Sequence, residues 1–240
     1  MKFFVDLHIH TVASGHAYST VDENVREASE KGLIIMGIAD HSAGMPGGAP
    51  LFHFHNLKAI PREIYGVTVL KGAEVNIVDY EGNLDLSDST LEGLDYAIAS
   101  FHPPCIEFAD APTVTKGLIK VMENPYVKII GHPGDSRYPF NIEEIVLASK
   151  RTGTLLEVNN ASLTPDSFRP GVRENLVTLL ELCKIHEVPI IVGTDAHVCY
   201  AVGEFELSVE LLKELKFPER LIMNTMPDKL AMLILNSKLK

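Results

Sequence analysis

The sequence predicts an α/β fold in which parallel strands form a barrel. Three observations support this fold class. Short β-branched runs alternate with amphipathic helical segments, which favours parallel strands joined by helices. The runs are almost uniformly apolar, as expected of strands covered on both faces. Seven of them follow one another, which favours a barrel, although the pattern is also compatible with an open sheet.

Six of the seven expected strands end in a polar or glycine residue, and the third ends at Val75, directly after Glu74. In chain order they are 2–6, 33–40, 67–75, 96–100, 127–131, 155–159 and 189–195. Between them, residues 21–32 have Val21, Val25 and Ala28 at helical spacing, with Gly32 as a stop signal. Residues 172–186 repeat the helical period with Leu176, Leu179, Leu180 and Cys183.

Two regions depart from this alternation. Residues 74–87 predict a hairpin that turns at Glu81-Gly82-Asn83, after the third strand. Near the C-terminus, residues 205–215 and 227–239 predict closing helices, and residues 221–225 form at most a short eighth strand. We therefore expect the barrel to close irregularly.

Length and composition predict one domain over residues 1–240. A net charge of −11 disfavours long nucleic acid and anionic membranes, because phosphate binding relies on clustered Lys and Arg. The first apolar run ends at Asp6, too short for a signal peptide, so a cytoplasmic protein is expected. The three cysteines lie far apart and indicate neither disulfides nor a thiolate metal site. No heptads mark an assembly interface, which leaves a homo-oligomer open.

Histidines and carboxylates lie at the carboxyl ends of the expected strands or in the loops that follow, where the loops of an α/β barrel converge. They are His8, His10, His16, His41, Glu74, His102, His132, Asp195 and His197. His8 and His10 are two residues apart on a strand, so both imidazoles project to the same side and can chelate one ion. Imidazole and carboxylate together suit zinc, manganese or iron. Nine such ligands exceed the four of one tetrahedral ion, so two or three metals are expected.

Seven motifs resemble those of the polymerase and histidinol phosphatase (PHP) family, and within it the YcdX-like phosphatases. In chain order they are DLHIHTVASGHAYST, ADH, GAEVNI, FHPP, GHPG, EVNNAS and GTDAH. The resemblance implies a distorted (β/α)7 TIM-like barrel with three divalent ions, usually zinc. It implies one ion on His8, His10, Glu74 and Asp195, and a second on Glu74, His102 and His132. The third would be held by His16, His41 and His197.

The resemblance implies a phosphatase that hydrolyses a small phosphorylated metabolite. We expect a hydroxide that bridges two ions to attack the phosphomonoester, with Glu74 and Asp195 as catalytic residues. Arg169 has the planar fork that suits phosphate, although a solvated loop charge explains it equally well. Arg137 is a weaker candidate. His53 and His55 lie in an expected loop, where they resemble the subfamily and suggest substrate contact or a gate.

Several smaller expectations accompany this interpretation. Arg62 should pair with a carboxylate or pack near the same loop, and the amides of Asn159 and Asn160 could hydrogen-bond the ligands. The physiological phosphoester, the metal in the cell and the acid for the leaving group are left open by the sequence.

Other functions compete with this one. A nucleotide phosphatase, a nuclease and a histidinol-phosphatase-like activity are all compatible with the same residues. A barrel amidohydrolase also begins with His-x-His but usually has a bridging lysine on strand four, and this chain has none near His102. A metal-storage or sensing protein without catalysis is the alternative from another class, but such sites tend to be coordinatively closed.

Overall fold

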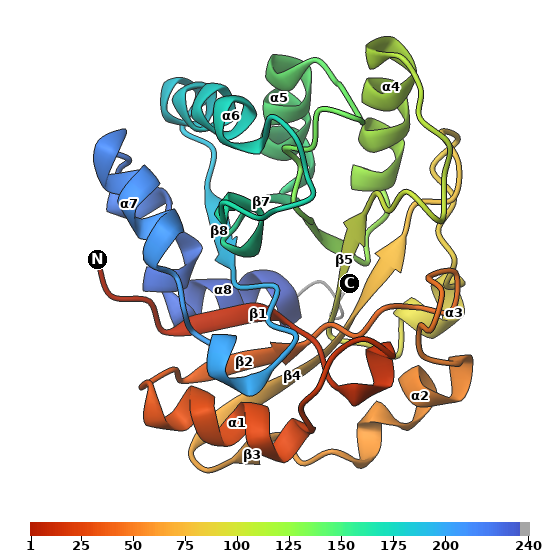
Figure 1. The fold of residues 1–240 in the computed structure, drawn as a ribbon, viewed down its shortest axis with the longest axis vertical. Helices are drawn as coiled ribbons and strands as arrows, with labels where there is room; N and C mark the ends of the chain where they lie inside the picture. The colour runs from red at the N-terminus through yellow and green to blue at the C-terminus, as the bar shows by residue number, and fades with distance from the viewer. Residues whose placement is uncertain (236–240) are drawn as a thin grey trace.

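The structure is a computed structural model that describes residues 1–235. Seven parallel strands form the sheet in the order β1-β2-β4-β5-β6-β7-β8, and the two-residue β3 (Glu63–Ile64) pairs antiparallel with β4 (Figure 1). The other bounds are β1 (Val5–Ile9), β2 (Ile35–Ile38), β4 (Val67–Asn76), β5 (Tyr96–Ser100), β6 (Val127–Ile130), β7 (Leu155–Asn159) and β8 (Ile190–Gly193). All seven expected strands are present, and the first, expected over 2–6, begins and ends three residues later, at Val5–Ile9.

The first and last strands close the barrel in two different ways. At the carboxyl end, the His10 amide donates to the Ala196 carbonyl at 2.8 Å, and the Ala196 amide donates to the His8 carbonyl at 3.2 Å. At the other end, the Asn224 side chain spans the gap. It accepts from the Val192 amide at 2.8 Å and donates to the carbonyls of Val5 and Val192 at 2.8 and 2.7 Å. The expected irregular closure is therefore confirmed.

Helices cover the outer face of the sheet and the amino end of the barrel. They are α1 (Val21–Glu30), α2 (Leu51–Asn56), α3 (Asp88–Leu91), α4 (Ala111–Met122), α5 (Ile142–Thr152), α6 (Val172–His186), α7 (Glu206–Glu214) and α8 (Pro227–Leu235). Helix α1 begins at a capping box, in which Thr20 and Glu23 each bond the other's main-chain N–H. The helix predicted over 172–186 matches α6, and of the helix predicted over 227–239, residues 236–239 lie outside the described residues. None of the helices in residues 1–235 combines the length and apolar character of a membrane span.

Short 3₁₀ helices occupy several loops, and the rest of the C-terminal region consists of such turns. The bounds are η1 (Val12–Ser14), η2 (Leu57–Ala59), η3 (Ala161–Leu163), η4 (Cys199–Ala201), η5 (Glu219–Leu221) and η6 (Met223–Thr225). The expected eighth strand is thus two 3₁₀ turns, with one isolated parallel bridge between Ile190 and Ile222.

Two apolar clusters separate the inside of the barrel from its outside. The inner cluster joins strand residues such as Val5, Leu70 and Leu155 to Leu230 and Ile234 of α8. Helix α8 therefore closes the amino end of the barrel. The larger outer cluster packs the other strand faces against the surrounding helices.

Tyr96 fills the middle of the barrel. Its hydroxyl donates to the Leu7 carbonyl at 2.6 Å and to the Ile38 carbonyl at 3.1 Å. Gly37 is required beside it, because a Cβ at that position would lie 2.1 Å from the Tyr96 hydroxyl. Tyr96 and the inner apolar cluster thus fill the amino half of the barrel.

Candidate metal centre

A bulge in β1 turns His8 and His10 toward the carboxyl mouth of the barrel. Asp6 pairs with Met36 and Ile9 with Ile38, so Leu7 and His8 together oppose Gly37 alone. Such an extra residue re-aims the side chains that follow it. Leu7 can therefore pack in the inner cluster while His8 and His10 both approach Asp195 Oδ1, with Nε2 distances of 3.5 and 3.2 Å.

Glu74, on β4, lies at the centre of the candidate site and is fully buried. Its Oε1 is 2.9 Å from His132 Nε2 and 3.4 Å from the Nε2 atoms of both His8 and His102. Its Oε2 is 2.8 Å from His41 Nδ1 and 3.6 Å from His10 Nε2. Five imidazoles thus surround one carboxylate. Burial by itself would raise the pKa of Glu74, but His102, His41 and His8 hold it well below its usual range.

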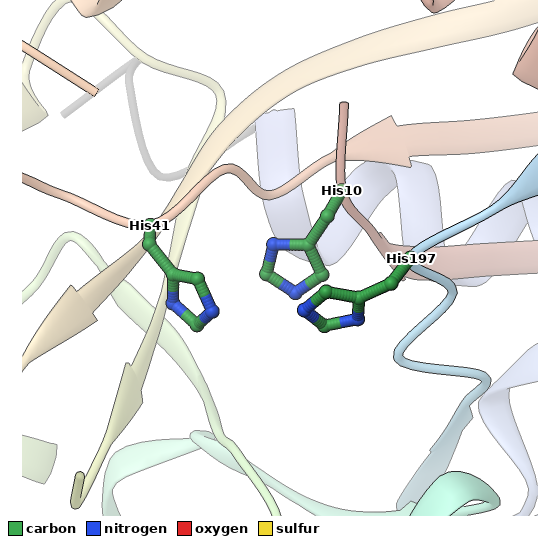
Figure 2. A group of neighbouring side chains, drawn as sticks. All are labelled: His10, His41 and His197. Atoms are coloured by element: carbon green, nitrogen blue, oxygen red, sulfur yellow. The ribbon is translucent and has the colours of Figure 1, made fainter. Parts of the chain in front are cut away.

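A second group of histidines lies toward the solvent side. Figure 2 shows the rings of His10, His41 and His197 converging on one space. The ring centroids of His10 and His41 are 4.4 Å apart, and those of His10 and His197 are 4.2 Å apart. His16 completes this group, because its Nε2 is 3.1 Å from His197 Nε2. The structure therefore brings all nine predicted side chains into one continuous cluster.

The donor atoms of the cluster fit divalent cations. Within the described residues, His8 Nε2 and His102 Nε2 are buried without a hydrogen-bond partner, and His41 Nδ1 and Glu74 Oε2, although 2.8 Å apart, lack hydrogen-bond geometry. A buried polar atom left in this way costs about 1–3 kcal/mol. Burial also lowers the pKa of His10 to about 3 and that of His132 to about 4, which keeps both imidazoles in the neutral form that binds metals. Cations bound here would satisfy the unpartnered atoms.

Three sets of donor atoms are compact enough to hold one ion each, with all atoms of a set within 4.8 Å of one another. They are His8 with His10 and Glu74, His41 with Glu74 and His102, and His10 with His41 and His197. Glu74, His10 and His41 each belong to two sets, so the sets adjoin one another.

Glu157, on β7, was not predicted as a functional residue. Its side chain is 1% exposed, and Oε1 accepts a hydrogen bond from His8 Nδ1 at 2.7 Å. Oε2 accepts from the main-chain N–H of His132 at 2.7 Å and from the Asn159 amide at 3.0 Å. The sequence signal that could have identified Glu157 is its position as a charged residue inside the apolar run LLEVN.

Two further carboxylates orient histidines of the cluster through one intermediate side chain. Asp40 accepts from Ser14 Oγ at 2.7 Å, and Ser14 Oγ lies 3.1 Å from His10 Nδ1. Asp85 accepts from the Asn76 amide at 2.6 Å, and Asn76 Oδ1 is 2.7 Å from His102 Nδ1. Such outer hydrogen bonds fix the ring orientation and tautomer of ligating histidines.

The predicted hairpin brings Asp85 into this position. An antiparallel bridge joins Ile77 to Leu84, and the Asp85 main-chain N–H donates to the Asn76 carbonyl at 3.2 Å. The turn itself is held by Asp79, which accepts from the main-chain N–H groups of Glu81 and Asn83. The hairpin is confirmed, and it returns a carboxylate to the cluster.

Arg169 reaches the cluster from the loop after β7. Its Nη1 donates to Ser162 Oγ at 2.9 Å and to Asp195 Oδ2 at 3.3 Å, and the side chain is 9% exposed. The interpretation as a solvated loop charge is therefore wrong. Asn159 also donates to Asp195 Oδ2, at 3.3 Å, as expected for a residue that supports a ligand. Asn160 instead accepts from the Ser208 amide, away from the cluster.

His53 and His55 lie on helix α2, and the expectation of a loop at this position is wrong. Two helical residues at this spacing point about 200° apart, so they cannot share one ion. His53 Nε2 lies 3.0 Å from Asp40 Oδ2, behind His10. His55 Nε2 lies 3.4 Å from Thr90 Oγ1 and does not reach the cluster.

The other two arginines considered from the sequence have carboxylate partners outside the cluster. Arg137 pairs with Asp135, with Nε 3.0 Å from both carboxylate oxygens, and lies between the rings of Phe108 and Phe168. Arg62 pairs with Asp95, which confirms the carboxylate partner expected for it.

A family model agrees with this architecture. The model of the PHP domain matches residues 6–161. The chain belongs to the PHP domain family. The matched residues include seven of the nine cluster residues, whereas Asp195 and His197 lie beyond them and join the PHP cluster through β8 and its loop.

Other proteins of known name resemble this PHP chain over nearly its whole length. A protein of Clostridium novyi (strain NT) named "probable phosphatase" is 46% identical over 230 residues, covering 96% of this chain and 93% of the relative. A protein of Thermoanaerobacter sp. (strain X514) with the same description is 47% identical over 226 residues, covering 94% and 91%.

Solved structures share the PHP fold. The crystal structure of histidinol phosphate phosphatase from Lactococcus lactis, complexed with zinc, L-histidinol and phosphate, has a TM-score of 0.60 and 18% identity. The similarity covers 89% of this chain and 94% of that one. This structural similarity supports the distorted, nearly closed TIM-like barrel. At 18% identity it is evidence for a shared fold alone.

Proposed function

We propose that this chain is a metal-dependent phosphatase that hydrolyses small-molecule phosphomonoesters. The observation that carries the proposal is the cluster of nine side chains that includes Glu74 at its centre, in which the buried His8 Nε2 and His102 Nε2 have no hydrogen-bond partner, at the carboxyl mouth of a PHP barrel. The names of the curated relatives, which match nearly the whole chain, support phosphoester hydrolysis. The zinc and phosphate bound in the Lactococcus lactis protein are consistent with it.

The proposed centre has three ions, with Glu74 shared between two of them. His8, His10, Glu74 and Asp195 form the first group, and Glu74, His102 and His132 form the second. His16, His41 and His197 form the third. The compact set of His8, His10 and Glu74 lies within the first group, and the other two compact sets share Glu74 and His102 with the second group and His41 and His197 with the third. The contacts of His132 with Glu74 and of His16 with His197 support placing His132 in the second group and His16 in the third. Zinc suits these donors best, and manganese and iron accept the same set.

Divalent cations, when bound here, would stabilise charge on the phosphoryl oxygens and lower the pKa of a water molecule. The chain's own residues have three tasks. Glu74 and Asp195 keep the donor groups at fixed separations, which makes them the proposed catalytic carboxylates. Arg169, beside Asp195, would bind a phosphoryl oxygen through its planar fork. Burial keeps His10 and His132 neutral, so neither is placed to protonate the leaving oxygen near pH 7.

Exposure of the third group favours catalysis over metal storage. His16 is exposed and the His197 side chain is 29% exposed, whereas His8, His10 and Glu74 are buried. A cluster open to solvent on one side can admit a phosphoester, whereas a storage site would be closed. The acidic chain favours small substrates over long nucleic acid. Histidinol phosphate is one substrate worth assaying, because the Lactococcus lactis protein shares the fold.

Elemental analysis combined with hydrolysis of p-nitrophenyl phosphate tests the proposal. We expect two to three equivalents of zinc, manganese or iron per chain, loss of turnover after chelation, and its return when metal is restored. Nucleoside monophosphates and histidinol phosphate, assayed in parallel, would rank the alternative substrates. Full metal content without hydrolysis of any phosphoester would contradict the proposal and favour a binding role or C–N hydrolysis.

A further inference from the structure

Glu157 contacts two histidines that belong to different proposed ion groups. It bonds the His8 ring of the first group and the His132 main chain of the second, from a side chain that is 1% exposed. We infer that Glu157 is a positioning residue that couples ion binding at these two groups. The inference rests on the proposed function, because it concerns the proposed ions.

The contact with His8 determines which ring nitrogen is available. The Nδ1–H of His8 donates to Glu157 Oε1 at 2.7 Å, so Nε2 is the atom that faces Glu74 and Asp195. A carboxylate behind a ligating imidazole fixes its tautomer and increases its basicity. Without the charge of Glu157, the His8 ring would lose both its orientation and part of its affinity for a cation.

The contact with His132 stabilises an unusual backbone conformation. His132 has a φ of +33°, in the left-handed region that residues with a Cβ rarely adopt. Its main-chain N–H donates to Glu157 Oε2 at 2.7 Å, and its carbonyl accepts from the Gly134 amide at 2.8 Å. This conformation directs His132 Nε2 to Glu74 Oε1 at 2.9 Å. Glu157 therefore supports the second group through the backbone, not through the ring.

Asn159 extends the same network toward Asp195. Its side-chain amide donates to Glu157 Oε2 at 3.0 Å and to Asp195 Oδ2 at 3.3 Å. Asp195 also has a positive φ, of 57°. Two of the proposed ligands thus depend on uncommon backbone conformations, and both are connected to Glu157.

The other two supporting carboxylates each act on a single proposed ligand, through an intermediate side chain. Asp85 approaches one ligand, His102, through Asn76, and Asp40 approaches His10 through Ser14. Among these three carboxylates, Glu157 alone bonds two proposed ligands directly. Asp85 is consequently a matched control, because it is also a supporting carboxylate that can be replaced by its amide.

The test compares Glu157→Gln with Asp85→Asn by measuring metal content during titration with a chelator. In Glu157→Gln we expect two ions to be lost together, at apparent affinities reduced about 10- to 100-fold. In Asp85→Asn we expect one ion to be weakened. Wild-type chelator midpoints in Glu157→Gln, or the loss of one ion alone, would overturn the inference.

A second measurement separates positioning from a general effect on folding. The unfolding temperature is measured for the metal-loaded and the chelated protein, in wild type, Glu157→Gln and Glu157→Asp. A positioning role predicts that both variants reduce the increase in unfolding temperature that metal produces, with Glu157→Asp closer to wild type because it keeps the charge. Equal losses in the loaded and chelated proteins would identify a structural residue and overturn the inference.

The result can be distinguished from failure of the proposed function. A wild-type protein that binds metal but cleaves no phosphoester contradicts the phosphatase assignment, whatever Glu157 does. An active wild type whose Glu157→Gln variant binds metal normally contradicts the coupling alone.

Discussion

Both ends of the barrel contain fully buried side chains, but these side chains are opposite in chemical character. At the amino end, Val5 and Leu70 pack against Leu230 and Ile234 of α8, and all four are at most 1% exposed. At the carboxyl end of the same strands, Glu74 is 0% exposed among imidazoles. Burial of side chains therefore contributes differently to the free energy of folding at the two ends.

The difference lies in what replaces water at each end. Removing apolar side chains from water stabilises the fold by about 25 cal/mol per Å². Removing a carboxylate and several imidazoles from water costs free energy unless partners replace the lost hydration. We therefore expect the amino end to determine folding stability and the carboxyl end to determine metal affinity and activity.

Glu74→Ala should have the largest effect. It removes the carboxylate shared by two proposed ion groups, so we expect loss of bound metal and a fall in kcat/KM of at least about 100-fold. Metal content and p-nitrophenyl phosphate hydrolysis measure the two effects. Turnover near that of wild type would contradict the assignment of the carboxyl end as the active centre.

Leu230→Ala should show the opposite pattern. The truncated side chain leaves a cavity between α8 and the strands, which should lower the free energy of unfolding by at least about 2 kcal/mol. Denaturant unfolding measures this loss, and metal content per folded chain and kcat/KM should match wild type. A parallel loss of metal from the folded protein would show that the two ends are not independent.

Arg169→Gln should affect substrate more than metal. The side chain contacts Asp195 but is not among the proposed ligands, so we expect metal content to be retained and KM to rise about tenfold, equivalent to about 1.4 kcal/mol. Arg173→Gln is the control, since the Arg173 side chain is 55% exposed and pairs with Glu214 at the surface. Equal kinetic effects in the two variants would argue against phosphate binding by Arg169.

The smallest effect should distinguish His53 from His55. His53 lies against Asp40, which supports His10 through Ser14, whereas His55 bonds Thr90. We expect His53→Gln to lower kcat/KM by a few fold, about 0.5–1 kcal/mol, and His55→Gln to leave it unchanged. Steady-state kinetics of both variants at saturating metal measures this difference. A larger effect in His55→Gln would indicate that α2 moves toward the substrate.

Local pattern was enough to predict the seven strands, because apolar runs buried on both faces have a strong signature. The histidines and carboxylates at strand ends were also predictable, since every parallel strand of a barrel ends at the same rim. Helix α2 was missed because its six residues lie among glycines and prolines that are typical of a loop. The contacts of Arg169 with Ser162 and Asp195 could not be predicted either, because the sequence of a long loop does not indicate which residues the loop packs against.

The sequence by itself determined the order of the seven parallel strands, the rim at which histidines and carboxylates gather and the identity of the nine proposed donor residues. Tertiary structure alone decided how these donors are held. The bulge at Leu7–His8 depends on the register between β1 and β2. The contacts of Glu157 with two histidines, and those of Asn224 with β1 and β8, join residues that are distant in the chain. Hydrophobic periodicity predicts on which face of its own helix or strand a residue lies. Contacts between elements depend on packing in three dimensions, and the sequence does not display that directly.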